Sequence, residues 1–168
     1  MKKLLFTIII LASALWGGAQ VPCWDGTVAE AYAGGDGTME NPYQIATPEQ
    51  LALLAEQTNT GVGGDAYYIL IEDICLNGSQ EYQWEPIGNA SWPFTGMFNG
   101  NGYIISDLYM TYQVYSGLFG FTQGAVIKDV EIEEANIPYG AFPISYIGLL
   151  VGYARNTNIY NCNTSCRN

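Results

Sequence analysis

Three glutamates in the second half of the chain are the strongest candidates for acid–base chemistry. Glu131, Glu133 and Glu134 lie close together, and glycosidases use a pair of carboxylates to cleave the glycosidic bond. However, Glu131 and Glu133 flank Ile132, so alternation along a strand turns both carboxylates outward, as on a solvated face. We therefore expect no glycosidase activity, although a carbohydrate-active β-helix protein stays open as an alternative.

Histidine is absent from the whole sequence. The zinc-peptidase motif His-Glu-x-x-His therefore cannot occur in it, and a serine or cysteine nucleophile would have no imidazole base. No phosphate-binding Gly-x4-Gly-Lys-Ser/Thr motif is present either. The sequence predicts no catalytic residue, no cofactor and no metal ion of its own. Metallopeptidase activity would require sequence beyond this chain.

Tyrosine side chains are the best candidates for contact with a ligand. The chain has 13 of them, and an exposed tyrosine can stack on a sugar or a protein surface while its hydroxyl forms a hydrogen bond. Tyr109, Tyr112 and Tyr115 lie close together and form the candidate contact set. The simpler interpretation, which we favour, is that these rings cover the strands.

The four cysteines of the chain allow three complete disulfide pairings. They are Cys23, Cys75, Cys162 and Cys166. Alternation places Cys75 between inward-facing Ile74 and Leu76, so its thiol should face outward. Cys162 takes an inward position in the repeat described below and could be a buried apolar residue. Cys23 and Cys75 are therefore the pair that we would test first.

Residues 1–19 have the three parts of a secretory signal peptide. Lys2 and Lys3 form the positive start, Leu4 to Trp16 the apolar run, and Gly17-Gly18-Ala19 the small-residue cleavage site. The apolar run is too short to span a bilayer. We expect cleavage after Ala19 and a secreted or cell-surface protein without a membrane-spanning segment.

The mature chain is strongly acidic. Removal of the signal peptide leaves three basic residues against 16 acidic ones, a net charge of about −13. Such a charge repels nucleic acid and anionic membranes. Aromatic residues make up 14% of the chain, which fits strands better than disorder.

A short pattern recurs along the chain: isoleucine, any residue, Asp or Asn, and then an apolar residue. It begins at Ile71, Ile105, Ile127 and Ile159. Leu118-Phe119-Gly120 and Leu150-Val151-Gly152 share the offset that separates the last two of these. Repeats of about 20–50 residues are typical of stacked architectures, and Asp or Asn tolerates the bend that the pattern requires.

We therefore predict an all-β solenoid in which each repeat forms one coil. A single coil cannot bury its apolar face, whereas stacked coils can. The four isoleucines should stack inside the solenoid, and a second column should contain Leu108, Val130 and Cys162. An ordinary β-sandwich is the alternative fold, because it also has short strands and turns at similar spacing.

One amphipathic helix should precede the coils. Thr47 is a good N-cap, Pro48 a good first residue, and Gln50 completes a capping box. Leu51, Leu54 and Ala55 fall on one face of this helix. A short helix of this kind can cover the open end of the solenoid core.

The chain then divides into three regions. Residues 1–19 form the signal peptide, residues 20–46 a loop-rich segment, and residues 47–168 a β-helix with an N-terminal helical cap. The last coil pattern ends at Thr164, close to Asn168. We expect either a C-terminal truncation of a longer repeat protein or end-to-end self-association, because an open coil exposes unpaired backbone groups.

Several segments resemble the GLUG-motif repeats of bacterial secreted and surface proteins. They are Phe94-Thr95-Gly96, Phe98 to Gly102, Gly117-Leu118-Phe119-Gly120 and Ile147 to Ala154, and the leader from Gly35 to Leu51 looks like that of Bacteroidetes members. Leu149 departs from the pattern at a position opposite Gly117 where the family often has glycine. The resemblance implies a right-handed parallel β-helix.

Similar repeats occur in adhesin-like proteins and in non-catalytic regions of IgA-specific metallopeptidases. The resemblance therefore implies a secreted or cell-surface structural or binding module of adhesin type. Its expected partner is a host or matrix glycoprotein or a polysaccharide, and not nucleic acid. The alternative is an N-terminal piece of a larger surface enzyme, such as a metallopeptidase.

Overall fold

The computed structural model describes residues 22–111, 113–138 and 145–167. Within these ranges the chain forms one helix, α1 (Pro48–Asn59), and otherwise short strands. The strands are β1 (Tyr43–Ile45), β2 (Tyr67–Leu70), β3 (Ile74–Cys75), β4 (Met97–Asn99), β5 (Ile104–Ser106), β6 (Tyr115–Ser116), β7 (Phe119–Gln123), β8 (Val126–Lys128), β9 (Glu131–Ala135), β10 (Tyr146–Ile147), β11 (Val151–Arg155), β12 (Asn158–Tyr160) and β13 (Asn163–Cys166).

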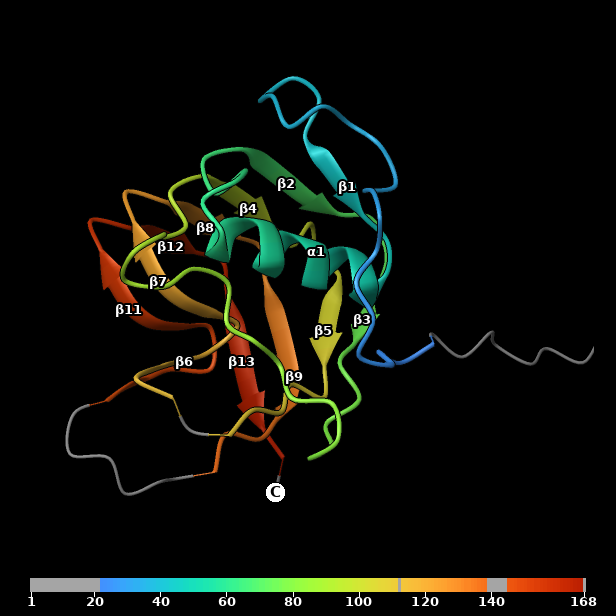
Figure 1. Cartoon of the computed structure of the whole chain (residues 1–168), viewed down its shortest axis with the longest axis vertical. Helices are drawn as coiled ribbons and strands as arrows, with labels where there is room; N and C mark the ends of the chain where they lie inside the picture. The colour runs from blue at the N-terminus through green and yellow to red at the C-terminus, as the bar shows by residue number, and fades with distance from the viewer. Residues whose placement is uncertain (1–21, 112, 139–144, 168) are drawn as a thin grey trace, which may run out of the picture.

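The strands stack into a parallel β-solenoid of about three turns. One sheet, the first side, has the order β1-β2-β4-β8-β12, and the second side has the order β3-β5-β9-β13. In both sheets neighbouring strands run parallel and come from successive coils. Figure 1 shows the two sheets beside each other, with β12 and β13 at the end opposite β1 and β3. The predicted parallel β-helix is therefore confirmed, and the alternative of a β-sandwich is wrong.

A third side closes the later coils. Here β6 pairs with β10 and β7 with β11, again in parallel. The coil before them joins this side through single bridges from Ile87 to Phe119 and from Phe94 to Thr122. From β2 onward, the chain thus passes through the first, second and third sides in turn.

Helix α1 takes the position of the third side in the earliest coil, between β1 and β2. Asn59 at its end donates a hydrogen bond to the carbonyl of Pro86 (3.0 Å) and accepts one from the amide of Gly88 (2.9 Å), which lie on the third side of the next coil. The apolar residues predicted to share one face, Leu51, Leu54 and Ala55, are buried in the common core. The helix therefore covers one end of that core.

The N-terminus of α1 is capped largely as the sequence predicts. The Thr47 hydroxyl accepts a hydrogen bond from the amide of Gln50 (3.4 Å), and Pro48 occupies the first turn. The Gln50 side chain accepts a hydrogen bond from the amide of Ala46 (2.8 Å) and not from that of Thr47. The capping box is thus one residue wider than expected, and its glutamine still provides a hydrogen-bond acceptor for a backbone amide that precedes the helix.

Large aromatic side chains fill the interior of the solenoid. The largest fully buried ones are Trp84, Tyr68, Phe94, Phe98 and Phe119. The ring of Phe119 packs against those of Phe94 (5.1 Å between centroids) and Phe98 (5.3 Å). The buried Trp84 indole donates its N–H to the carbonyl of Leu118 (3.1 Å), so burial leaves no orphaned donor on this ring.

The predicted register holds between the last two coils and is wrong before them. Ile127 pairs with Ile159, and Phe119 with Val151, as expected. Ile105, in contrast, pairs with Ile74 and Ile132, while Phe98 is the residue that stacks on Ile127. The expected stacks of Ile71 with Ile105 and of Leu108 with Val130 do not form.

The error arises because two different corners of the coil use the same sequence pattern. Asp129 (φ 53°) connects β8 to β9, whereas Asp107 (φ 58°) follows β5 and corresponds to Glu134 (φ 53°) in the next coil. Both corners require a left-handed backbone conformation, which Asp and Asn tolerate well. The similarity between the Ile105 and Ile127 segments therefore reflects equivalent geometry at non-equivalent corners.

Strands β12 and β13 lie at the ends of their sheets. No strand among the described residues pairs with their outer edges, and the side chains of Ile159 and Tyr160 are 42% and 46% exposed. Cys162, expected to be inward and buried, is only partly buried here. End-to-end association through this edge stays a prediction.

Candidate binding site

The structure describes two of the three tyrosines proposed from the sequence, and these two differ in exposure. The expected exposure of Tyr109 is wrong: its side chain is 6% exposed and its backbone bridges Asn136 on the next coil. Tyr112 lies outside the described residues. Tyr115 is half-buried on β6 and is the member of the set that reaches the surface in a group of aromatic rings.

Aromatic residues face outward on the third side, where β7 departs from strict alternation. Phe119 and Thr122 are both fully buried although they lie three positions apart, and Phe121 between them is half-buried and points away from the core. In β6, Ser116 points inward, and its hydroxyl accepts a hydrogen bond from the amide of Gln113 (3.0 Å). Tyr115 therefore faces outward beside Phe121.

The next coil adds two more rings, which complete a group that we call the aromatic cluster. Its members are Tyr115, Phe121, Tyr146 and Tyr153. Tyr115 and Tyr146 are paired residues of β6 and β10, and their rings stack with 5.5 Å between centroids and 13° between planes. Phe121 packs at 4.8 Å from Tyr153, and Tyr153 packs edge-on at 4.9 Å from Tyr146. Tyr146 is the most open member at 41% exposed.

Glycines allow the backbones beneath the aromatic cluster to approach closely. A Cβ atom on Gly117 would lie 2.5 Å from the carbonyl oxygen of Gly148, and one on Gly120 would lie 2.6 Å from that of Gly88. Neither position has room for a side chain. Gly148, and not Leu149, lies opposite Gly117. The glycine that the repeat pattern places at position 149 is therefore present one residue earlier, at Gly148.

A pocket of about 330 Å³ adjoins the aromatic cluster at Tyr115. Its polar lining comes from Glu85, Asn89 and Gln113, and its apolar lining includes Pro86 and Val114. The side-chain amide of Gln113 donates a hydrogen bond to the Glu85 carboxylate (3.4 Å). An aromatic wall beside a few convergent polar groups is the usual composition of a small-ligand site.

The three glutamates considered for catalysis all lie on β9. Ile132 is fully buried, and Glu131 and Glu133 lie on the opposite, outward face of β9, as expected. Glu131 accepts a hydrogen bond from the Asn163 side chain (3.4 Å). Glu134 occupies a corner and forms an ion pair with Arg167 (3.3 Å). Within the described residues, no group of three or more His, Cys, Asp or Glu side chains is arranged to hold a metal ion.

Cys23 and Cys75, the pair proposed from the sequence, are joined by a disulfide. A single parallel β-bridge also joins the two residues, with the backbone amide of Trp24 donating to the carbonyl of Cys75 (2.9 Å). The disulfide therefore fixes the N-terminal segment to the outer edge of β3. Among the described residues, Cys162 and Cys166 carry free thiols, and burial raises the pKa of Cys162 above its ordinary value.

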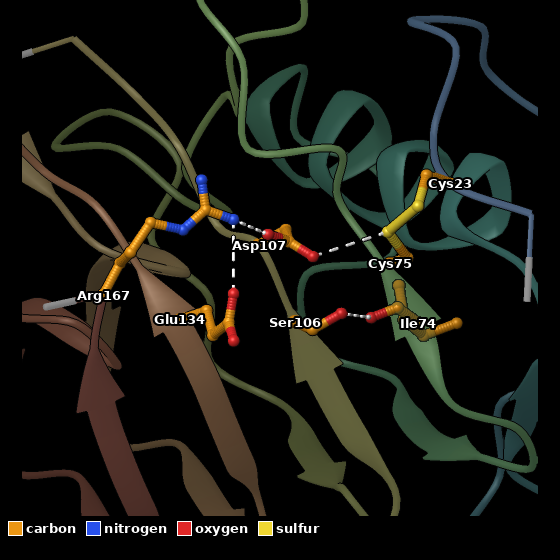
Figure 2. Close-up of polar contacts among 7 residues, drawn as sticks. All are labelled: Cys23, Ile74, Cys75, Ser106, Asp107, Glu134 and Arg167. Carbon is orange, nitrogen blue, oxygen red and sulfur yellow. Dashed lines mark hydrogen bonds and ion pairs between the residues drawn. A yellow bond between two sulfur atoms is a disulfide. The ribbon is translucent and has the colours of Figure 1, made fainter.

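A short row of polar groups extends from this disulfide along the second side (Figure 2). Asp107 lies between Cys75 and Arg167, and its Oδ2 is 3.8 Å from the Cys75 sulfur. That contact is not a hydrogen bond, because a disulfide sulfur carries no proton. The row connects residues of successive coils.

Comparisons with known proteins give distant and partial matches. The chain is 32% identical over 130 residues to a Gly-rich membrane protein of Evansella cellulosilytica, which covers 74% of this chain and 14% of that protein. It is 32% identical over 145 residues to halomucin of Haloquadratum walsbyi, covering 79% of this chain and 2% of halomucin. The chain thus spans only a small part of each relative.

No family model matches the chain, and no solved structure does. The helix of the structure is too short and too polar to cross a bilayer, as far as the described residues extend.

Proposed function

We propose that this chain is an exported, non-catalytic repeat module with a structural or binding role at the cell surface. The observation that carries the proposal is the outward-facing aromatic cluster, which two coils of a rigid solenoid build together. A stacked scaffold holds such side chains at fixed spacing, as a binding surface requires. The sequence start, with its signal-peptide pattern, supports export.

The two relatives support the surface location. Their names describe a membrane protein and a mucin, and this chain matches a short part of each. A repeat module is expected to match one small segment of a very long protein, as this chain does. The net charge of −11 for the whole chain fits a surface that must stay hydrated and soluble.

We also infer that the chain belongs with the GLUG-type repeats and shares their adhesin-like role. The residues that carry this resemblance have clear structural duties here. Phe94 and Phe98 are fully buried in the core. A Cβ atom on Gly96 would lie 2.1 Å from the carbonyl oxygen of Ala66, and one on Gly100 would lie 2.2 Å from that of Asp129. In each segment the phenylalanine thus fills the core, and the glycine two residues later lets the neighbouring coil approach closely.

Surface display tests the proposal. Intact source cells should bind an antibody raised against the chain, and external protease should remove the signal, while a cytoplasmic marker stays protected. Mass spectrometry of the surface material should find an N-terminus near Gln20. Protein retaining Met1 and found only inside the cell would refute the proposed role.

A further inference from the structure

We propose that the aromatic cluster and the pocket beside Tyr115 together bind a neutral polysaccharide. The inference rests on the proposed surface role and adds to it the site and the chemical class of the ligand.

The rings of the aromatic cluster have the shape and exposure that contact with a sugar requires. The Tyr115 and Tyr146 rings stack on each other, 13° from parallel, and their strands belong to successive coils, so the aromatic cluster spans both coils and Tyr146, 41% exposed, is its open ring. Flat aromatic faces stack on apolar faces of other molecules, while tyrosine hydroxyls stay available to water or ligand. The C–H face of a pyranose ring is such a surface. A ligand with repeated rings could therefore extend across both coils.

The pocket beside the aromatic cluster has a polar lining that suits a sugar. Its volume of about 330 Å³ lies near the lower end of small-ligand sites, about 300–1,000 Å³. Glu85, Asn89 and Gln113 supply carboxylate and amide groups, and Tyr115 forms part of the wall. A carboxylate accepts hydrogen bonds from hydroxyls, and an amide side chain both accepts and donates them. Hydroxyls are the groups that a sugar presents in greatest number. One ring would stack on the aromatic cluster while its neighbour enters the pocket.

The charge of the chain favours neutral polysaccharides over acidic ones. The pocket lining includes one carboxylate, and none of its members is Lys or Arg. The chain as a whole carries a net charge of −11. A uronic acid or sulfated polymer would therefore be repelled at long range and would meet no cation in the pocket lining, where Arg155, at the far end of β11, is absent. A neutral polymer meets neither obstacle.

Native gel electrophoresis through gels that contain a soluble polysaccharide measures the binding. The probes are a β-glucan, a galactomannan and an arabinoxylan, with polygalacturonate as the acidic comparison. We expect at least one neutral polymer to retard the purified chain and polygalacturonate to have no effect. Retardation by polygalacturonate alone, or by none of the four, would overturn the inference.

Three variants locate the site. Tyr146→Ala and Gln113→Ala should each weaken retardation roughly 2- to 10-fold, while Tyr146→Phe keeps the ring and should retain most of it. Tyr160→Ala is the matched control, because Tyr160 is similarly exposed (46%) but lies on the first side, in β12. Thermal unfolding shows whether each variant is folded. Equal weakening by Tyr160→Ala, or none by Tyr146→Ala and Gln113→Ala, would show that the ligand binds elsewhere.

The two proposals can fail separately. A chain that is displayed on the cell surface but is not retarded by any neutral polymer refutes the ligand and leaves the surface role intact. A chain found only inside the cell refutes the surface role, whatever the gels show.

Discussion

Arg167 and Asp107 form an ion pair although 60 residues separate them in the sequence. The same guanidinium lies 3.3 Å from the carboxylate of Glu134 (Figure 2). Asp107 and Glu134 occupy the same corner in successive coils, both with a left-handed backbone. Stacking therefore brings two negative charges together, and Arg167 offsets their repulsion.

Replacing Arg167 should lower stability by a small, salt-dependent amount. Arg167→Gln removes the positive charge between two carboxylates, but all three side chains are partly exposed, so we expect a loss of about 0.5–1 kcal/mol in the free energy of unfolding. Urea unfolding at low salt measures it, and the difference should shrink at roughly 1 M salt because screening weakens the pair.

Arg155→Gln provides the control, because Arg155 is exposed on β11 and forms no ion pair within the described residues. An equal loss from both variants would mean that general charge, and not the corner, explains the effect.

Val130 and Glu131 are neighbours in sequence with opposite environments. Val130 is 1% exposed, and Glu131 faces outward on β9. Val130→Asp should unfold the domain or cost at least about 3 kcal/mol, because it places an unpaired charge in the core. Glu131→Lys should change stability by about 0.5 kcal/mol or less. Circular dichroism during thermal unfolding compares the two, and similar melting temperatures would contradict the orientation of β9.

The sequence allowed the fold class and the last coil register to be predicted, because these depend on local signals. Alternation of apolar and polar residues identified the strands. The offset that joins Ile127 to Ile159 also describes the register correctly, because the corners of these two coils have equal length. It failed for Ile105 because Asp107 lies at the corner after β5, whereas Asp129 lies at the corner between β8 and β9. The residue pattern of a corner does not say which corner of the coil it forms.

The aromatic cluster was only partly visible in the sequence for a related reason. The offset from Phe119 to Val151 also takes Phe121 to Tyr153, so that pair could have been found. Tyr115 instead pairs with Tyr146, one residue away from the position which that offset predicts. The shift occurs between β10 and β11, and only the backbone pairing reveals it.

Close packing between coils should make Gly96 one of the least replaceable residues. A Cβ atom there would lie 2.1 Å from the Ala66 carbonyl oxygen, which belongs to the neighbouring coil's backbone and cannot move aside cheaply. We expect Gly96→Ala to cost about 2–3 kcal/mol or more through overpacking. Chemical denaturation measures this cost.

Gly102→Asn is the matched control for Gly96. Gly102 has a φ of 79°, and a Cβ atom on it would have no neighbour within 4 Å, while asparagine tolerates this left-handed conformation. Its cost should stay within about 0.5 kcal/mol. If Gly96→Ala proved as harmless, the coils would have to lie further apart than they do here.

The two free thiols should differ in reactivity. Burial raises the pKa of Cys162, whereas Cys166 is exposed at the end of β13. Only the thiolate reacts with iodoacetamide, so a raised pKa leaves less reactive sulfur at neutral pH, and access to Cys162 is also reduced. We expect Cys166 to be alkylated first near neutral pH, and the rate at Cys162 to keep rising as the pH passes the ordinary thiol value.

Peptide mass spectrometry at several pH values gives both rates. Unfolding in urea should make the rates similar, and faster labelling of Cys162 in the folded chain would contradict its partly buried position against β8 and β9.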